Sequence, residues 1–208
     1  MAAIPVALIV LYLVFGGQSA PSSSTETKRS VSRSSTQGDF RPADGQSVQV
    51  IDYESESPAK DFDRIYQFIT TKYSSISLED ARLISQYLVD YGQVHRIDPK
   101  FVAALVARES SFNKRAVSST GAKGLGQIKS FNFESLHITD PFNIEQNVSG
   151  TTQYIKSMIM KWPTHRYQTH LGLASYFKGF GAISRSNQRL DRQTRGYVSD
   201  ILNIYKQL

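Results

Sequence analysis

The chain has 208 residues, contains no cysteine and carries a formal net charge of +6. This length suits one domain of ordinary size with additional segments. The absence of cysteine excludes disulfides, thiolate catalysis and Cys-based metal sites. Residues 61–208 hold 19 Lys and Arg against 12 Asp and Glu, whereas residues 22–60 hold 5 against 6. The basic surplus therefore belongs to residues 61–208, where it would suit nucleic acid, anionic lipid or acidic glycopolymers.

The first 20 residues have the pattern of an export signal. Residues 2–15 are almost wholly apolar, and residues 16–20 are small or polar. The apolar run has the length of a signal peptide, because a membrane-spanning helix needs about 20 apolar residues. No Lys or Arg precedes it, so residues 1–20 are interpreted as either a cleaved signal peptide or a retained signal anchor.

Two further changes in composition divide the rest of the chain. Residues 21–60 are rich in Ser, Thr, Gln and acidic residues, which predicts a disordered linker because too little apolar surface can be buried. From residue 61 onward, apolar residues recur at helical spacing over 62–69 and 83–91, and Gly92 interrupts the second pattern. We expect a mainly α domain over residues 61–208, in which these two helices pack against the core.

A third helix begins at Asp98-Pro99, because Asp can cap the free N–H groups and Pro fits the first turn. Phe101, Leu105 and Glu109 follow at i, i+4 and i+8, which puts the carboxylate at the end of a buried face. Burial and the negative end of the helix dipole both favour the protonated acid, as general acid catalysis requires. The alternative is a solvated Glu109 paired with a nearby base: Lys114, Arg115 or Lys123.

Glycines and further helical patterns follow. Gly124 and Gly126 permit turns or close approach, and we expect the turn to lead into another helix. Asp140-Pro141 predicts the start of a helix that reaches Trp162, within which Asn147 is interpreted as a structural tie to a neighbouring loop. Residues 171–177 predict a buried helix stopped by Gly179, and residues 194–208 predict a closing helix.

Five motifs in this half of the chain resemble, in order, those of the soluble lytic transglycosylase (SLT) catalytic domain, a goose-type-lysozyme-like family. The resemblance covers roughly residues 90–208. The motifs are Glu109-Ser110-x-Phe112; Gly121-Ala122-x-Gly124-Leu125-x-Gln127; Asn147 and Val148 with Gly150, compared with Asn-Ile-x-x-Gly; Ala174-x-Tyr176-x-x-Gly179; and Thr194-x-x-Tyr197-Val198.

The resemblance implies a lysozyme-like helical fold and a role for five side chains. Glu109 would be the catalytic acid, and the substrate-binding residues would be Ser110, Gln127, Tyr176 and Tyr197. The chain departs from the family pattern at two places. Gly126 stands where Met is usual, which removes an apolar wall, and Phe177 stands where Asn is usual, so that a polar contact is lost or supplied by Lys178.

The implied activity is that of a peptidoglycan lytic transglycosylase that cleaves the MurNAc-β-1,4-GlcNAc bond and forms 1,6-anhydro-MurNAc. The partners would be glycan strands, and also cell-envelope or secretion-type machinery, in the periplasm or cell envelope. A hydrolytic muramidase and a decayed glycan-binding or assembly module are the alternatives. No nucleic-acid motif is recognisable. The four histidines lack metal-ligand spacing, so we expect neither metal nor cofactor and interpret them as surface or capping residues.

Overall fold

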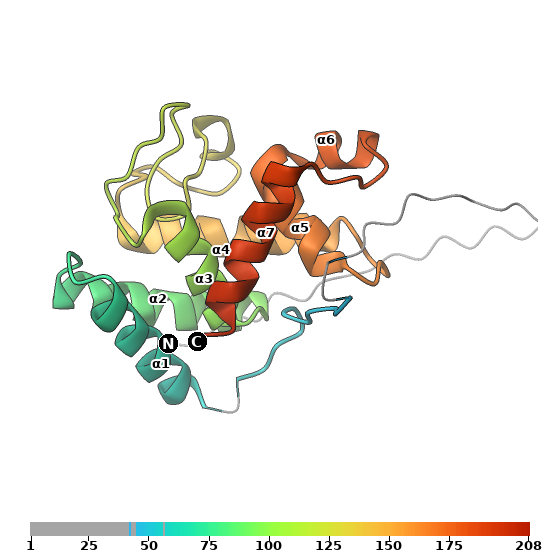
Figure 1. Ribbon diagram of the computed structural model, residues 1–208. Helices are drawn as coiled ribbons and strands as arrows, with labels where there is room; N and C mark the ends of the chain where they lie inside the picture. The colour runs from blue at the N-terminus through green and yellow to red at the C-terminus, as the bar shows by residue number, and fades with distance from the viewer. Residues whose placement is uncertain (1–41, 43–44, 56) are drawn as a thin grey trace, which may run out of the picture. The chain divides into compact units, whose positions relative to one another are not determined.

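The structure, a computed structural model, describes residues 42, 45–55 and 57–208. The predicted export segment and much of the predicted linker lie outside the described residues. The described part is mainly helical, as predicted, and isolated β-bridges replace strands (Figure 1). Its helices are α1 (Pro58–Lys72), α2 (Leu78–His95), α3 (Pro99–Ser110), the short 3-10 helix η1 (Ser130–Asn132), α4 (Ile144–Met160), α5 (Gln168–Lys178), α6 (Phe180–Arg185) and α7 (Arg192–Tyr205). None of these described helices has both the length and the apolar character that crossing a bilayer requires.

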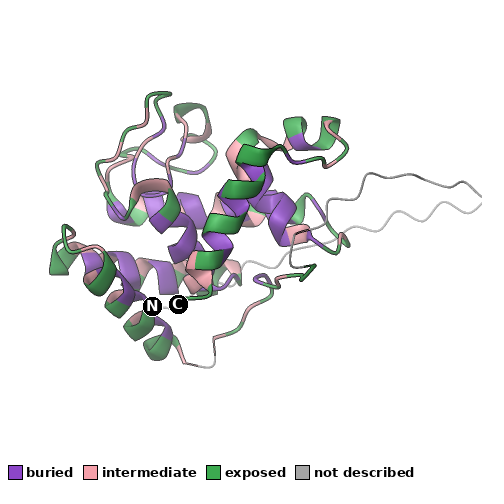
Figure 2. Ribbon diagram, in the orientation of Figure 1, coloured by how far each residue is buried: buried purple, intermediate pink, exposed green. Residues whose placement is uncertain are grey.

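Helix α3 lies at the centre of the packing. It contacts α1, α2, α4 and α7, and residues 101–107 are all buried (Figures 1 and 2). The run Phe-Val-Ala-Ala-Leu-Val-Ala is apolar on every side, so no face of the helix needs contact with water. Asp98 caps the start of α3, where its Oδ1 accepts from the Lys100 N–H at 2.9 Å, and Pro99 occupies the first turn as predicted.

The packed domain begins before residue 61. Val50 and Ile51 are buried, and the Val50 carbonyl accepts from the Asp98 N–H at 2.8 Å. The Val48 carbonyl accepts from the Thr169 hydroxyl at 2.5 Å. These contacts satisfy backbone groups that a free linker would leave to water. The predicted linker boundary at residue 60 is therefore wrong, because residues 48–51 and the start of α1 are part of the packed domain.

A cluster of charged and phenolic side chains joins this N-terminal segment to three helices. Lys100 Nζ lies 2.7 Å from Asp61 Oδ1 on α1, 3.0 Å from Asp98 Oδ1 and 2.9 Å from the Tyr53 hydroxyl. The Tyr205 hydroxyl on α7 donates to the other Asp98 oxygen at 2.5 Å. Each buried charge therefore has an opposite charge or a hydrogen-bond partner, which offsets the cost of removing it from water. The cluster fixes the start of α3.

Two predicted helix boundaries were wrong. Helix α2 continues through Gly92 to His95, and a Cβ at Gly92 would lie 3.0 Å from the Pro99 Cβ, so this glycine lets α2 approach the start of α3. Helix α4 begins at Ile144 with Asn143 as its cap, because Asp140 instead forms a turn by accepting from the Phe142 N–H. The turn at Gly124 and Gly126, which was expected to lead into another helix, leads instead into the short η1 and further turns before α4.

The packing of α4 against α5 and α6 includes the single tryptophan of the chain. Trp162 is buried just after α4, and its indole N–H donates to the Ser175 hydroxyl on α5 at 2.9 Å. Its ring lies 5.2 Å from that of Phe180 on α6, centroid to centroid. The buried polar atom is therefore satisfied while the ring packs, the usual arrangement for a buried indole. These contacts position α5, which carries Tyr176 and Phe177.

Candidate active site

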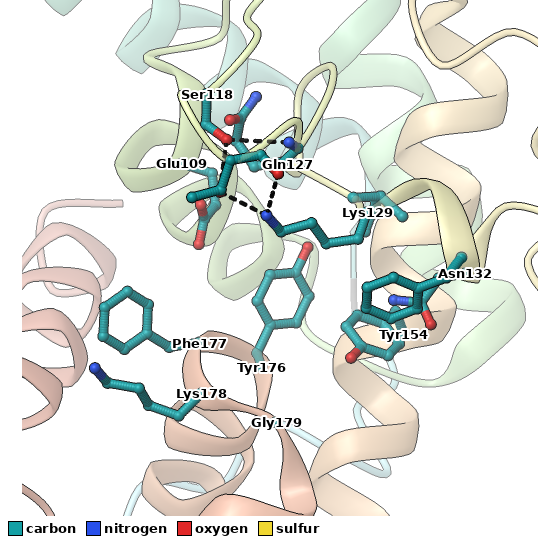
Figure 3. A pocket seen from close by; sticks show the side chains of 14 residues that line it. Glu109, Ser118, Gln127, Lys129, Asn132, Tyr154, Tyr176, Phe177, Lys178 and Gly179 are labelled. Carbon is teal, nitrogen blue, oxygen red and sulfur yellow. Dashed lines mark hydrogen bonds between the residues drawn. The ribbon is translucent and has the colours of Figure 1, made fainter.

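Glu109 lies in the last turn of α3 and faces a cavity of about 410 Å³ (Figure 3). The other walls come from the loop of residues 118–128, called the glycine loop here, from α4 and from the end of α5. They include Gln127, Lys129, Tyr154, Tyr176 and Phe177. Among the described residues that line the cavity, Glu109 is the only carboxylate. The arrangement places one acid in a cavity whose lining combines aromatic residues with polar residues.

Tyr197 on α7 contacts the Glu109 carboxyl group. Its hydroxyl donates a short hydrogen bond to Glu109 Oε1. Burial raises the pKa of Glu109 above its ordinary value, and the Tyr197 hydrogen bond and the Arg108 charge oppose that rise without cancelling it. Burial, followed by the nearby Glu109 charge, raises the pKa of Tyr197 well above its usual value. The phenol therefore remains a donor while Glu109 gives up or takes a proton.

The Tyr197 ring is itself confined by its neighbours. Phe177 stacks on it with a centroid separation of 4.4 Å and an interplanar angle of 14°. The Arg108 guanidinium lies 5.5 Å from the ring centroid and pairs with Asp200 at 3.0 Å. Aromatic stacking and cation–π contacts both favour one ring orientation. The orientation of the Glu109 partner is therefore set by residues from α3, α5 and α7.

Gln127 lies on the glycine loop, which folds back on itself through backbone bridges. Its own φ is +51° and that of Gly124 is +74°, so the turn uses left-handed backbone at two positions. The Gln127 amide donates to the Ala116 carbonyl at 3.2 Å and to the Gly124 carbonyl at 3.0 Å. The side chain lines the cavity while it holds the loop closed, and its amide oxygen can still accept a hydrogen bond.

Gly126 is the point where the loop, α4 and α5 meet. Its N–H donates to Asn147 Oδ1 at 2.8 Å, and its carbonyl accepts from the Tyr176 hydroxyl at 2.6 Å. Asn147 also donates to the Pro141 carbonyl at 2.8 Å, so the prediction that Asn147 ties its helix to a loop is confirmed. A Cβ on Gly126 would lie 1.9 Å from Thr151 Oγ1. No side chain fits at Gly126 without movement of α4.

In the Asn-Ile-x-x-Gly pattern the glycine corresponds to Thr151 of this chain and not to Gly150. That pattern places its glycine four residues after Asn147, at position 151, where this chain has Thr151, so the alignment with Gly150 was wrong. A side chain is thus absent from the loop at Gly126 and present on α4 at Thr151, which is fully buried. Thr151 therefore occupies, from α4, the space that a side chain on Gly126 would need.

The structure brings together four of the five predicted site residues. Glu109, Gln127 and Tyr176 line the cavity, and Tyr197 contacts Glu109. Ser110 lies outside the described lining, and its hydroxyl donates to the Val106 carbonyl of its own helix at 3.2 Å.

Lys178 was one of two alternatives for the polar contact missing at Phe177, the other being its loss. It lines the cavity and donates to Gln193 at 2.9 Å. Sequence reasoning did not identify Tyr154, which follows Asn147 at i+7 and Thr151 at i+3 on α4 and lines the cavity. That spacing was the available signal. The histidines were interpreted as surface or capping residues, and the surface position is wrong for His170, which is buried.

No group of His, Asp and Glu within the described residues is arranged to hold a metal ion. The remaining carboxylates of the second half of the chain are exposed: Glu134, Asp140, Glu145, Asp191 and Asp200. The described site can therefore donate and accept one proton at Glu109 and can offer hydrogen bonds from the loop and from Lys178.

The sequence is similar to a known protein family and to named relatives. The family model described as Transglycosylase SLT domain matches residues 86–197. A protein named membrane-bound lytic murein transglycosylase F from Pectobacterium atrosepticum is 33% identical over 134 residues, which cover 62% of this chain and 27% of that protein. A protein of the same name from Desulfosudis oleivorans is 32% identical over 97 residues, which cover 45% and 21% respectively. The chain thus matches less than a third of the length of these relatives.

The fold is similar to that of a solved enzyme. The crystal structure of the 70 kDa soluble lytic transglycosylase SLT70 from Escherichia coli matches with a TM-score of 0.52 at 19% sequence identity. The match covers 72% of this chain and 29% of that one. The predicted lysozyme-like helical fold is therefore confirmed.

Proposed function

The chain belongs to the transglycosylase SLT domain family, and from this premise we propose that it is a peptidoglycan lytic transglycosylase whose catalytic acid and base is Glu109. Its substrate would be the MurNAc-β-1,4-GlcNAc bond of glycan strands. The observation that carries the proposal is the single carboxylate in the lining of the cavity, with a pKa raised by burial. Most glycoside hydrolases use two carboxylates to activate water or to form a covalent intermediate. A site with one acid suits a reaction in which the sugar supplies its own nucleophile.

The proposed reaction needs only one residue for both proton transfers. Protonated Glu109 donates its proton to the bridging oxygen as the bond from that oxygen to C1 of MurNAc breaks, and the N-acetyl oxygen stabilises C1. The 6-hydroxyl of the same MurNAc then attacks C1 and gives its proton to the Glu109 carboxylate. The products are a 1,6-anhydro-MurNAc end and a free GlcNAc 4-hydroxyl, and no water is consumed.

The other site residues support these transfers. The Tyr197 phenol stabilises the carboxylate that forms after the first transfer, and burial favours the return of the proton. Gln127 and Tyr176, which face the cavity from the loop and from α5, are proposed to contact the glycan. Ser110 is proposed to support the last turn of α3, because its hydroxyl bonds to the backbone of that helix.

The cell envelope is the proposed location. Both relatives are named as membrane-bound murein enzymes, and residues 1–20 carry the pattern of an export signal or anchor. The basic surplus of residues 61–208 suits a wall polymer that bears carboxylates. Assembly with secretion-type or other envelope machinery is proposed on the same ground of location.

Digestion of purified sacculi by the 208-residue chain tests this function, with the soluble muropeptides identified by mass. The wild type should release products lighter by one water than the hydrated muropeptides. Glu109→Gln should lower the rate by about 10²–10⁴-fold, the usual contribution of a placed acid. Glu134→Gln, a matched change at an exposed carboxylate, should leave the rate unchanged. Hydrated reducing ends would identify a muramidase instead, and sacculus binding without cleavage would identify a binding module.

A further inference from the structure

Phe131 in η1 is an exposed apolar residue at the candidate active site. Its side chain lines the same cavity as Glu109, yet the residue is 80% exposed. Burial of a Phe side chain favours the folded state, and an exposed ring forgoes most of that gain. Exposed apolar groups at the edge of a cavity are typical of ligand-binding sites. The ring is therefore available to a ligand at the mouth of the cavity.

The neighbouring sequence provides an internal comparison. Phe133, two residues later, packs against the apolar cluster of Ile128, Leu136 and Ile138 beneath the turn. Phe133 is thus partly buried on this cluster. Phe131 is not among the residues that pack against it and stays exposed. Packing explains Phe133 but does not explain why position 131 carries a large apolar side chain.

The backbone that carries Phe131 is well fixed. The Asn132 N–H donates to the Lys129 carbonyl at 2.9 Å, and the Phe133 N–H donates to the Ser130 carbonyl at 3.1 Å. Lys129 Nζ donates to the Thr120 carbonyl at 2.7 Å and to the Thr120 hydroxyl at 2.5 Å, which ties η1 to the glycine loop (Figure 3). A Phe side chain has only two torsions to fix. Little conformational entropy is then lost when a ligand settles on the ring.

We propose that Phe131 is a stacking platform for a pyranose ring of the glycan strand, at the mouth of the cavity and outside the group of residues that perform the reaction. The proposal rests on the proposed function. A polymer bound at Glu109 must leave the cavity across its edge, and the C–H groups on one face of a pyranose complement the electron-rich face of an aromatic ring. The platform would hold the strand in register while Glu109 acts.

Binding to purified sacculi tests the proposal in the Glu109→Gln background, where the strand is bound but not cut. Phe131→Ala should weaken binding by about threefold to tenfold, the range expected for one lost aromatic contact. Phe131→Tyr keeps the ring and should bind as the parent does. Val94→Ala removes apolar surface from another exposed residue, 71% exposed on α2, and should have no effect.

The outcomes separate this proposal from the proposed function. Equal binding by Phe131→Ala and the parent, or equal loss in the Ala and Tyr variants, would overturn the stacking platform. A Glu109→Gln chain that does not bind sacculi at all would overturn it as well. Cleavage by the wild-type chain is measured separately, so a protein that cleaves sacculi while Phe131→Ala binds normally keeps its function and loses only this inference.

Discussion

The Tyr197 hydroxyl donates to Glu109 Oε1 across the contact between α7 and α3. This hydrogen bond favours the carboxylate, whereas burial of Glu109 favours the acid, and the net effect is a raised pKa. A general acid that later serves as a base needs both forms within reach near neutral pH. The Tyr197 hydrogen bond therefore affects both the proton affinity and the orientation of Glu109, the proposed catalytic group.

Removal of the Tyr197 hydroxyl should shift the pH dependence of kcat/KM in a definite direction. Tyr197→Phe removes an interaction that lowers the pKa of Glu109, so this pKa should rise further. Because the acid must be protonated to act, the alkaline limb of kcat/KM should shift to higher pH, while turnover falls as the carboxylate loses its donor. Tyr205→Phe is the matched control, since Tyr205 bonds to Asp98 at the other end of α3. An unshifted limb in Tyr197→Phe would contradict this role.

The raised pKa of Glu109 also predicts a link between stability and pH. The folded state binds the Glu109 proton more tightly than the unfolded state, so the resulting stability is present below the ordinary value near 4.5 and is lost as pH rises through the folded value. Gln cannot ionise and should keep that stability. Glu109→Gln should therefore melt at a higher temperature than wild type at pH 7, and the gap should narrow near pH 4. Circular dichroism melts at the two pH values measure it. A gap that does not change with pH would mean that the pKa of Glu109 is not raised.

Phe177 should act on the reaction through Tyr197. The stack at 4.4 Å confines the Tyr197 ring, and aromatic pairs of this kind are worth about 0.5–1.5 kcal/mol. Phe177→Leu should lower kcat by about threefold to tenfold and shift the alkaline limb in the same direction as Tyr197→Phe. Phe180→Leu, which alters the contact with Trp162 instead, should leave the limb in place. A fall in kcat without a shift would assign Phe177 only to the cavity wall.

The contact between Gly126 and Thr151 predicts strong coupling in a double-mutant cycle. Gly126→Met should destabilise the fold, because a Cβ there would lie 1.9 Å from Thr151 Oγ1. Thr151→Gly should destabilise it by loss of buried packing. The double variant should be more stable than the sum of the single effects by about 1–3 kcal/mol, measured by urea unfolding. Additive effects would mean that the two positions do not compensate.

A glycine with open space around it gives the control for that cycle. A Cβ on Gly196 in α7 would meet nothing within 4 Å. Gly196→Ala should therefore stabilise the protein by about 0.5–1 kcal/mol through the preference of Ala for helix.

The parts of the structure that sequence predicted well are those set by local chemistry. The start of α3 follows from the Asp98-Pro99 pair, and the position of Glu109 follows from helical spacing along that helix. The stop at Gly179 follows from its φ of +87°. In each case the residues that decide the structure are neighbours in the chain, so their pattern carries the information.

The parts that sequence missed depend on side-chain contacts that helical periodicity does not indicate. Helix α4 begins at Ile144 because the Gln146 side chain accepts from the Thr139 and Asp140 N–H groups at 2.9 Å and holds the preceding turn. Gly92 lies within α2, where a Cβ would come 3.0 Å from the Pro99 Cβ. The stack of Phe177 on Tyr197 joins α5 to α7, and nothing in either local pattern indicates it. Phe177 can be recognised from sequence as a departure from a family pattern, but the sequence does not show that it stacks on Tyr197.

The position of Trp162 gives the protein a built-in optical probe. Its indole is the only one in the chain, and it bonds to Ser175, the residue immediately before Tyr176 in the cavity wall. Intrinsic fluorescence excited at the indole band should therefore follow the docking of α4 on α5 without any label. Rapid mixing of the Glu109→Gln chain with soluble glycan fragments should make the arrival of substrate at Tyr176 visible as a change in emission.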